Sequence, residues 1–323
     1  MSLENKIRKS VSLSPMTSFK IGGLADLFFE VEKEKDLIDI FDYIKKNKIN
    51  HFILGGGSNI VFNDNGFRGI VLRMNNTETD FKDTTATVGA GKKITELTRE
   101  LKDRSLSGLE WAYGIPATIG GLVVGNGGAF GQEISDCVLS VKVFDINKNK
   151  FSALKKNECC FDYRDSIFKQ NKELIVWEIS LILKQDSPNE IEEKMIKNIN
   201  YRKNHQPIDY PSAGSFFKNI KLDSLKKEDW NRLIKIIGKS LNNEEIERVR
   251  KHKAIPIGLL IDLLDLKGKK IGGAEISTKH GNFLINKKNA KAEEVIILSS
   301  IIKQKIRHKF NLQVYEEIEY VGF

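Results

Sequence analysis

Three consecutive glycines, Gly55, Gly56 and Gly57, directly follow the apolar run His51 to Leu54. A short apolar run that stops at glycines predicts a buried strand followed by a loop. Because glycine has no side chain, the backbone N–H groups of such a loop can face a phosphate or pyrophosphate without obstruction. A lone triplet is more often a plain tight turn, and Ser58-Asn59 completes the loop in either case.

A second glycine-rich stretch runs from Gly114 to Gly131. Two such loops, separated by a strand and a helix, favour close backbone approach to one large, flat, phosphorylated ligand, and a dinucleotide cofactor would fit. The alternative is that the glycines only serve bulges and turns. Neither G-x-G-x-x-G opening a helix after the first strand nor G-x-x-x-x-G-K-[ST] is present, which disfavours a Rossmann dehydrogenase and a P-loop NTPase.

Hydrophobic periodicity predicts an α+β chain of three domains, residues 1–75, 76–186 and 187–323. The boundary near residue 186 rests on the polar, proline-containing stretch Gln185 to Pro188. The predicted helices lie within 33–48 and around 94–101, 191–199 and 295–306, and the predicted strands lie at 51–54, 69–72, 86–88, 141–144, 177–183 and 313–321.

The composition excludes several classes of protein. The 323 residues are 40% hydrophobic, which excludes dominant disorder, and three cysteines are too few for a disulfide scaffold. The net charge of +9 comes from lysines spread along the chain, which favours a solvated surface over a nucleic-acid footprint, although such a field also attracts phosphate ligands. The first residues lack a signal peptide's apolar core, which predicts a cytoplasmic protein without membrane insertion.

Several polar residues are candidates for chemistry. Arg164 lies in Tyr163-Arg164-Asp165-Ser166, and Ser215 lies among small residues just before Lys218 and Asn219. An Arg-Asp neighbour pair is usually a surface contact, and no G-x-S-x-G elbow supports serine hydrolysis. The five histidines show no ligand spacing with one another or with the cysteines, so no metal site is expected.

Taken in order, these segments resemble the bacterial UDP-N-acetylenolpyruvoylglucosamine reductase (UDP-N-acetylmuramate dehydrogenase) family. The resemblance extends from Thr17 to Gly322 and implies a two-part, vanillyl-alcohol-oxidase-type FAD-binding region, residues 1–75 and 76–186, followed by an α+β substrate domain. The motifs that carry it are Leu54 to Asn59, Gly114-Ile115-Pro116, Tyr163 to Ser166, Gln206-Pro207, Ser212 to Asn219 and Ile271 to Ala274.

The family's reaction, as the resemblance implies it, has two halves. NADPH reduces the flavin, and the enolpyruvyl ether of UDP-N-acetylglucosamine is then reduced to the lactyl ether of UDP-N-acetylmuramate, in peptidoglycan precursor synthesis. Motif matching makes Ser215 the proton donor and Arg164 and Glu317 its electrostatic partners. A cation and a carboxylic acid can stabilise the enolate that hydride addition creates, and a hydroxyl can then deliver the proton.

The same matching assigns binding residues but no metal, nucleic acid or obligate protein partner. Lys203 and Asn219 are implied for the UDP diphosphate of the substrate. The residues implied for FAD are Gly55, Gly56, Gly57, Ser58 and Asn59 at the pyrophosphate and Ile115, Pro116, Gly120, Gly121, Asn126, Gly128 and Ala129 along the cofactor.

The chain departs from the family pattern at four positions, which concern local loop shape: Ala117 in place of glycine, Gly127 in place of alanine, Ile220 in place of proline and Glu319 in place of arginine. No long tyrosine-bearing insertion follows the strand that ends at Leu183. The chain therefore resembles the shorter subtype, which lacks the loop that folds over the substrate.

Two other functions stay open at this point. One is a flavin oxidase of the same fold superfamily that acts on an alcohol, which the segment around Ser215 and Glu317 argues against. The other is a non-catalytic nucleotide- or RNA-binding protein, which only the pI of about 9.2 favours.

Overall fold

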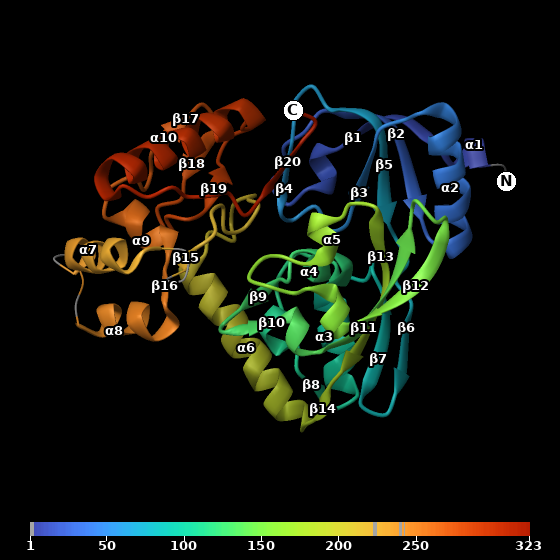
Figure 1. Cartoon of the computed structure of the whole chain (residues 1–323), viewed down its shortest axis with the longest axis horizontal. Helices are drawn as coiled ribbons and strands as arrows, with labels where there is room; N and C mark the ends of the chain where they lie inside the picture. Colours follow the sequence, from blue (N-terminus) through green and yellow to red (C-terminus); the bar gives the residue numbers. More distant parts are fainter. Residues whose placement is uncertain (1–2, 222–224, 239–240, 242) are drawn as a thin grey trace. The chain divides into compact units, whose positions relative to one another are not determined.

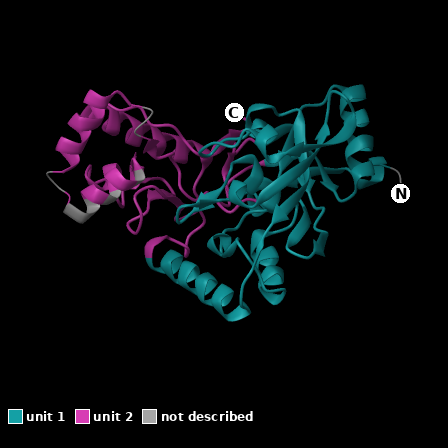
Figure 2. Ribbon diagram, turned by 60° about the horizontal axis from the view of Figure 1, so that its bottom comes forward, with its two compact units in different colours: residues 1–16, 24–57, 66–204 teal, residues 17–23, 58–65, 205–323 magenta. Residues whose placement is uncertain are grey.

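Figure 1 shows the computed structural model of the chain, which describes residues 3–221, 225–238, 241 and 243–323. The backbone divides into two compact units (Figure 2). Two short N-terminal segments belong to the unit that is otherwise C-terminal. The two boundaries between the three predicted domains stay a prediction. Unit 1 comprises residues 1–16, 24–57 and 66–204, and unit 2 comprises residues 17–23, 58–65 and 205–323.

The first sheet of unit 1 has the strand order β1-β2-β5-β3, with β2 and β3 parallel to β5 and β1 antiparallel to β2. The helix predicted within residues 33–48 is α2 (Glu34–Asn47). Its apolar face lies in one core cluster with Phe29 and Ile70 of the sheet. The apolar run before the glycine triplet forms β3, as predicted. The strands are β1 (Arg8–Ser12), β2 (Leu24–Val31), β3 (His51–Leu54) and β5 (Phe67–Met74).

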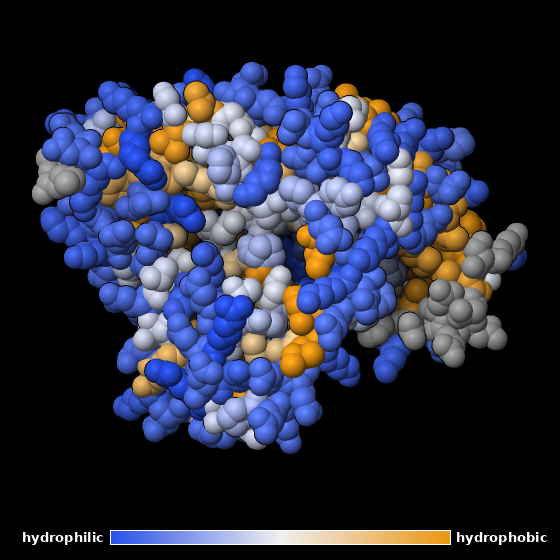
Figure 3. Space-filling view, turned by 180° about the vertical axis from the view of Figure 1, so that it is seen from behind, coloured by the Kyte–Doolittle hydropathy of each residue, from blue (hydrophilic) through white to orange (hydrophobic). Residues whose placement is uncertain are grey.

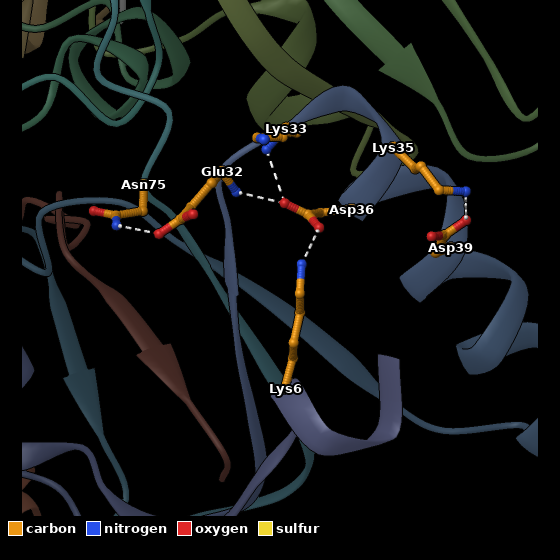
Figure 4. A network of polar contacts seen from close by, with 7 residues as sticks. All are labelled: Lys6, Glu32, Lys33, Lys35, Asp36, Asp39 and Asn75. Atoms are coloured by element: carbon orange, nitrogen blue, oxygen red, sulfur yellow. Dashed lines mark hydrogen bonds and ion pairs between the residues drawn. The ribbon is translucent and has the colours of Figure 1, made fainter. Parts of the chain in front are cut away.

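A polar network fixes the start of α2 (Figure 4). The carboxylate of Asp36 accepts hydrogen bonds from the backbone N–H groups of Glu32 (3.1 Å) and Lys33 (2.9 Å) and from Lys6 Nζ (3.0 Å). Burial by itself raises the pKa of Asp36, but these hydrogen bonds outweigh burial and hold that pKa below its usual value. An ionised carboxylate in the first turn also stabilises the helix, because its negative charge lies near the positive end of the helix dipole.

The second sheet of unit 1 is antiparallel, with the strand order β12-β11-β13-β7-β6. Val141 and Val143 alternate into the core as predicted, and both are fully buried. Helices α3 (Ile94–Asp103) and α4 (Ile119–Val124) share that core. The strands are β6 (Thr79–Lys82), β7 (Thr85–Gly89), β11 (Val138–Asp145), β12 (Lys150–Lys155) and β13 (Leu174–Ile182).

Shorter elements complete unit 1, and its last long helix is α6 (Pro188–His205). The others are α1 (Leu3–Lys6), η1 (Ser14–Met16), β8 (Leu106–Ser107), η2 (Glu110–Ala112), β9 (Gly128–Ala129), β10 (Gln132–Glu133), η3 (Ile134–Asp136), η4 (Lys156–Cys159), α5 (Ile167–Gln170) and β14 (Lys184–Gln185).

Unit 2 is built around α10 (Ala292–Phe310) and a three-stranded sheet of β17 (Lys270–Ile271), β18 (Ala274–Ile276) and β19 (Leu284–Asn286). Helix α10 buries the apolar face that its sequence predicts. The remaining elements are β4 (Ile60–Phe62), β15 (Ile220–Lys221), α7 (Lys227–Ile237), α8 (Asn243–His252), β16 (Ala254–Ile255), α9 (Ile257–Asp262) and β20 (Glu319–Val321).

One predicted element is much shorter than expected. The sequence predicts a strand over residues 313–321, but only β20, residues 319–321, pairs as a strand, in parallel with β4 (Figure 1). Ahead of β20, Glu316 forms an isolated bridge with Phe217. Alternation in the sequence is a local signal, whereas a continuous strand needs a partner along its whole length, and this segment changes partner.

Figure 3 shows one face of the molecule, on which hydrophilic residues predominate and hydrophobic residues form separate groups. Among the helices of the described residues, none combines the length and the apolar character that a membrane span needs.

Candidate active site

Ser215 lies where a partly exposed loop enters the core of unit 2. The two residues that follow it, Phe216 and Phe217, are each 1% exposed, and their ring centroids lie 5.1 Å apart. The residue before it, Gly214, has φ +78°, which favours glycine, and a Cβ there would meet nothing within 4 Å. Two buried aromatic rings thus anchor the chain directly after Ser215, while the space beside Gly214 stays open.

Glu317 lies on the segment that pairs with the Ser215 loop. The backbone N–H of Glu317 donates to the carbonyl oxygen of Phe216 (2.8 Å), and the N–H of Lys218 donates to the carbonyl oxygen of Tyr315 (3.0 Å). Glu317 therefore bonds the residue directly after Ser215, although Ser215 and Glu317 are 102 positions apart in the sequence. Two of the three predicted catalytic residues, Ser215 and Glu317, come together in this way.

Asn59 belongs to the same part of unit 2. Its Nδ2 donates to the carbonyl oxygen of Glu317 (3.1 Å), and its own carbonyl oxygen accepts from the N–H of Glu319 (2.9 Å). Ser58 and Asn59 belong to unit 2, whereas Gly55 to Gly57 belong to unit 1. The chain passes from one unit to the other inside the predicted pyrophosphate motif.

Arg164 belongs to unit 1, where its side chain ties the motif around it to the second glycine-rich loop. Its Nη2 donates to the carbonyl oxygen of Gly128 (2.7 Å) and its Nη1 to that of Asn126 (3.3 Å). Asn126 is 1% exposed, and its Nδ2 donates to Glu133 Oε2 and to the carbonyl oxygen of Asp162, both at 2.9 Å. Three predicted residues, Arg164, Asn126 and Gly128, are thus joined in one hydrogen-bonded cluster.

The two glycine-rich loops meet in unit 1. A Cβ on Gly56 would lie 3.0 Å from the backbone nitrogen of Thr118 and 3.1 Å from both Ala117 Cα and Pro116 O. A Cβ on Gly55 would lie 2.8 Å from Thr118 Oγ1. Gly57 has φ +64°. The first loop therefore needs glycine for its contact with the second, and this contact confirms that the two loops lie together.

The other glycines of the second loop differ in what surrounds them. Gly120 packs against Ala90, whose Cβ would lie 2.7 Å from an added Cβ, and Gly128 packs against the backbone of Gln132. An added Cβ on Gly121, which is exposed, would meet only Thr118 Oγ1 at 3.4 Å. Gly121 and Gly131, which is also exposed and where an added Cβ would meet nothing within 4 Å, thus leave bare backbone facing outward. Ile115 is half-buried, Pro116 is exposed, and Ala129 lies in the β9–β10 hairpin.

The two predicted substrate residues belong to different units. Lys203 is exposed on α6 in unit 1. Asn219, in unit 2, accepts a hydrogen bond at its Oδ1 from the backbone N–H of Ile257 (3.3 Å).

Two of the three cysteines, Cys137 and Cys159, are buried. Burial raises the pKa of the Cys137 and Cys159 thiols to about 11, so both stay protonated near neutral pH. Cys160 is exposed and borders a surface hollow of about 810 Å³ that none of the predicted site residues lines. In the part of the chain that the structure describes, no group of three His, Cys, Asp or Glu residues could hold a metal ion.

Arg202 is a buried residue near the second loop that sequence reasoning missed. It is 7% exposed, its Nη2 donates to the carbonyl oxygen of Trp111 (2.8 Å), and its guanidinium lies 5.1 Å from the ring centre of Phe130. Burial lowers its pKa to about 10. Its helical spacing from the buried residues Ile191 and Met195 could have indicated that it faces the core.

Comparisons with known proteins cover both parts of the chain. Residues 25–149 match the FAD binding domain model, and residues 206–321 match the UDP-N-acetylenolpyruvoylglucosamine reductase C-terminal domain model. The UDP-N-acetylenolpyruvoylglucosamine reductase of Bacillus pumilus is 33% identical, over 98% of this chain and 94% of that protein. The chain belongs to the UDP-N-acetylenolpyruvoylglucosamine reductase family. That of Bacillus subtilis is 31% identical, over 99% of this chain and 96% of that protein.

A solved structure agrees with this reductase family assignment. The crystal structure of the UDP-N-acetylenolpyruvylglucosamine reductase from Thermus caldophilus aligns with a TM-score of 0.74 and 29% identity, covering 98% of this chain and 99% of that chain. Family membership confirms the predicted α+β fold class, with a vanillyl-alcohol-oxidase-type FAD-binding region and a C-terminal reductase domain. It also confirms the predicted enzyme class, an FAD-dependent oxidoreductase.

Proposed function

We propose that this chain catalyses the NADPH-dependent, FAD-mediated reduction of UDP-N-acetylglucosamine enolpyruvate to UDP-N-acetylmuramate. The observation that carries the proposal is the pairing of the Ser215 loop with the Glu317 segment. The pairing joins the backbone segments that carry a hydroxyl and a carboxylate, in a region that matches the reductase C-terminal domain. The reductases of Bacillus pumilus and Bacillus subtilis align over nearly the whole chain, which supports the same reaction.

The residues of the two glycine-rich loops fit FAD. A flat, doubly phosphorylated ligand needs backbone without side chains, and Gly121 offers such backbone beside the contact of Gly55 and Gly56 with residues 116–118. We assign the pyrophosphate to Gly55, Gly56, Gly57, Ser58 and Asn59, and the rest of the cofactor to Ile115, Pro116, Gly120, Gly121, Asn126, Gly128 and Ala129. When bound, FAD supplies hydride transfer between NADPH and the enolpyruvyl ether.

Reduction of the enolpyruvyl double bond requires a hydride at one carbon and a proton at the other. Negative charge develops on the carbon beside the carboxylate after the hydride arrives, and it spreads onto that carboxylate. Arg164 and Glu317 stabilise this charge in our proposal, the first as a cation and the second as a carboxylic acid. The Ser215 hydroxyl then delivers the proton, so the double bond is lost and the lactyl ether is complete.

The remaining assignments concern the sugar nucleotide and the domains. Lys203 and Asn219 are proposed to bind the UDP diphosphate, Lys203 as a point charge. Residues 1–75 and 76–186 are proposed to hold FAD, and residues 187–323 to bind the substrate. NADPH and the enolpyruvyl sugar nucleotide are the partners that this reaction requires.

A product assay tests the proposal. The flavin-loaded protein is given NADPH and UDP-N-acetylglucosamine enolpyruvate, and mass spectrometry follows the sugar nucleotide. We expect a gain of two hydrogens for each NADPH consumed. A flavin oxidase that acts on an alcohol would instead leave the enolpyruvyl ether unchanged and reduce its flavin with an alcohol. A protein that binds no flavin would contradict the FAD assignment itself.

A further inference from the structure

Asn282 holds the Ser215 loop by both its side chain and its backbone. Its Oδ1 accepts from the backbone N–H of Phe217 (3.0 Å), and its Nδ2 donates to the carbonyl oxygen of Phe217 (2.9 Å). Its own carbonyl oxygen accepts from the N–H of Phe216 (2.8 Å). One asparagine thus satisfies three backbone groups of the two residues that follow Ser215, across 65 positions of sequence.

Asn282 is itself fixed. It is 3% exposed, and its backbone N–H donates to His280 Nδ1 (3.2 Å). The Oδ1 and Nδ2 contacts differ in kind, so only one orientation of the amide satisfies both. A buried amide with all of these partners has little freedom, and it transmits this rigidity to the backbone that it binds.

These hydrogen bonds hold the backbone directly after Ser215. The peptide group between Ser215 and Phe216 is held by Asn282, and the carbonyl group of Phe216 is held by the N–H of Glu317. No other side chain within the described residues is shown to bind the backbone of Phe217. Without the amide of Asn282, the N–H and carbonyl groups of Phe217 lose their partners, and buried groups without partners drive the backbone to move.

We propose that Asn282 is a positioning residue for the proton transfer, because it locks the backbone that aims the hydroxyl of Ser215. This inference rests on the proposed function of Ser215. A displacement of about 1 Å can cost about 100-fold in rate, so loss of the amide of Asn282 should slow the proton-dependent step by about 10- to 100-fold. Reduction of the flavin by NADPH needs no proton from Ser215 and should keep its rate.

The test compares Asn282→Ala with a matched control, Asn286→Ala, in the flavin-loaded protein. Asn286 is also buried in unit 2, but its side chain bonds the carbonyl oxygens of Phe19 and Lys20 and the N–H of Ala290. Thermal melts should show comparable losses of stability. Stopped-flow absorbance should show that only Asn282→Ala slows flavin reoxidation by UDP-N-acetylglucosamine enolpyruvate.

A second variant keeps the test decisive where Asn282→Ala does not fold. Asn282→Asp keeps the shape and the acceptor for Phe217 N–H but places an oxygen against the carbonyl oxygen of Phe217. It should also slow reoxidation selectively. Equal slowing of both half-reactions, or equal effects of Asn282→Ala and Asn286→Ala on reoxidation, would overturn the inference.

A double variant separates this inference from the proposed function. If Asn282 acts through Ser215, adding Asn282→Ala to Ser215→Ala should slow reoxidation by less than about twofold, whereas independent effects would multiply. Multiplying effects would overturn the positioning role and leave the proposed function intact. A wild-type flavin that NADPH reduces but the enolpyruvyl sugar nucleotide does not reoxidise would overturn the proposed function, and the inference with it.

Discussion

The residues proposed for proton transfer in unit 2 and those proposed for the cofactor in unit 1 are held by different physical means. In unit 2, main-chain hydrogen bonds join Phe216 to Glu317 and to Asn282. In unit 1, Gly55 and Gly56 lie so close to residues 116–118 that a Cβ has no room. Removing the side-chain oxygen of Ser215 leaves the backbone path in unit 2 intact. Adding a methyl group to Gly55 or Gly56 in unit 1 forces a loop to move.

The comparison predicts two classes of variant. Substitution of Ser215 should change one chemical step and leave cofactor content and stability nearly unchanged. Substitution of the first glycine loop should change cofactor content and stability together.

Ser215→Ala should abolish most of the second half-reaction and spare the first. General acid catalysis typically contributes about 10²–10⁴-fold, so reoxidation of the flavin by the enolpyruvyl sugar nucleotide should slow by that factor. Ser215→Cys, which keeps a transferable proton, should recover part of the loss. The two half-reactions are measured separately by stopped-flow absorbance, with a thermal melt of each variant. Equal slowing of both would mean that Ser215 only shapes the turn beside Gly214.

Arg164→Ala should slow reoxidation more than it weakens substrate binding, because the enolate charge is larger in the transition state than in the ground state. Loss of one such donor typically costs about 10²–10³-fold in the chemical step. The variant also loses the hydrogen bonds to Gly128 and Asn126, so some loss of flavin is expected as well. Rates of fully flavin-loaded protein at several substrate concentrations check this. A change confined to KM would make Arg164 a binding residue.

Gly56→Val should lower both flavin content and stability, because its side chain would push against Ala117 and Thr118. Overpacking of this kind typically costs about 1–3 kcal/mol. Gly57→Val should act similarly through its positive φ. The matched control is Gly125→Ala, whose added Cβ would meet only Gly121 O at 3.7 Å. Absorbance of bound flavin and urea denaturation measure the two effects. Full flavin content in Gly56→Val would move the phosphate site elsewhere.

The smallest expected effect is on the pH dependence of stability. Burial lowers the pKa of His280 below its ordinary value of 6.5, although Asp262 partly opposes this. The unfolded chain therefore binds this proton at a higher pH than the folded chain does. The contribution to stability is complete above about pH 6.5 and is lost as the pH falls through the lower, folded pKa. Urea midpoints at about pH 7 and pH 5 should differ less in His280→Gln than in the wild type. An unchanged difference would contradict this.

The strongest local patterns predicted the fold best. Helices α2 and α10 were predictable because their apolar residues recur at helical spacing over several turns. The terminal strand over 313–321 was overpredicted because alternation says nothing about the partner, and the segment ahead of β20 pairs with the Ser215 loop instead. Pairing over such distances depends on tertiary structure.

The candidate site was predictable where a family motif names the residue and not where a role depends on geometry. Ser215 and Glu317 were assigned from motifs 102 positions apart, and the structure brings their segments together. Asn282 carries no such signal, because an asparagine in a sequence does not reveal which distant backbone groups its amide will meet. The motif names Gly120, but its contact with Ala90 appears only in the folded chain.

The most direct test of the proposed function is an anaerobic titration of the wild-type protein. NADPH is added first, and its hydride should bleach the flavin absorbance. UDP-N-acetylglucosamine enolpyruvate is added next, after excess NADPH has been removed. We expect the oxidised flavin spectrum to return with one equivalent of the sugar nucleotide and UDP-N-acetylmuramate to form in the same amount. A flavin that stays bleached until oxygen is admitted would contradict the proposed function.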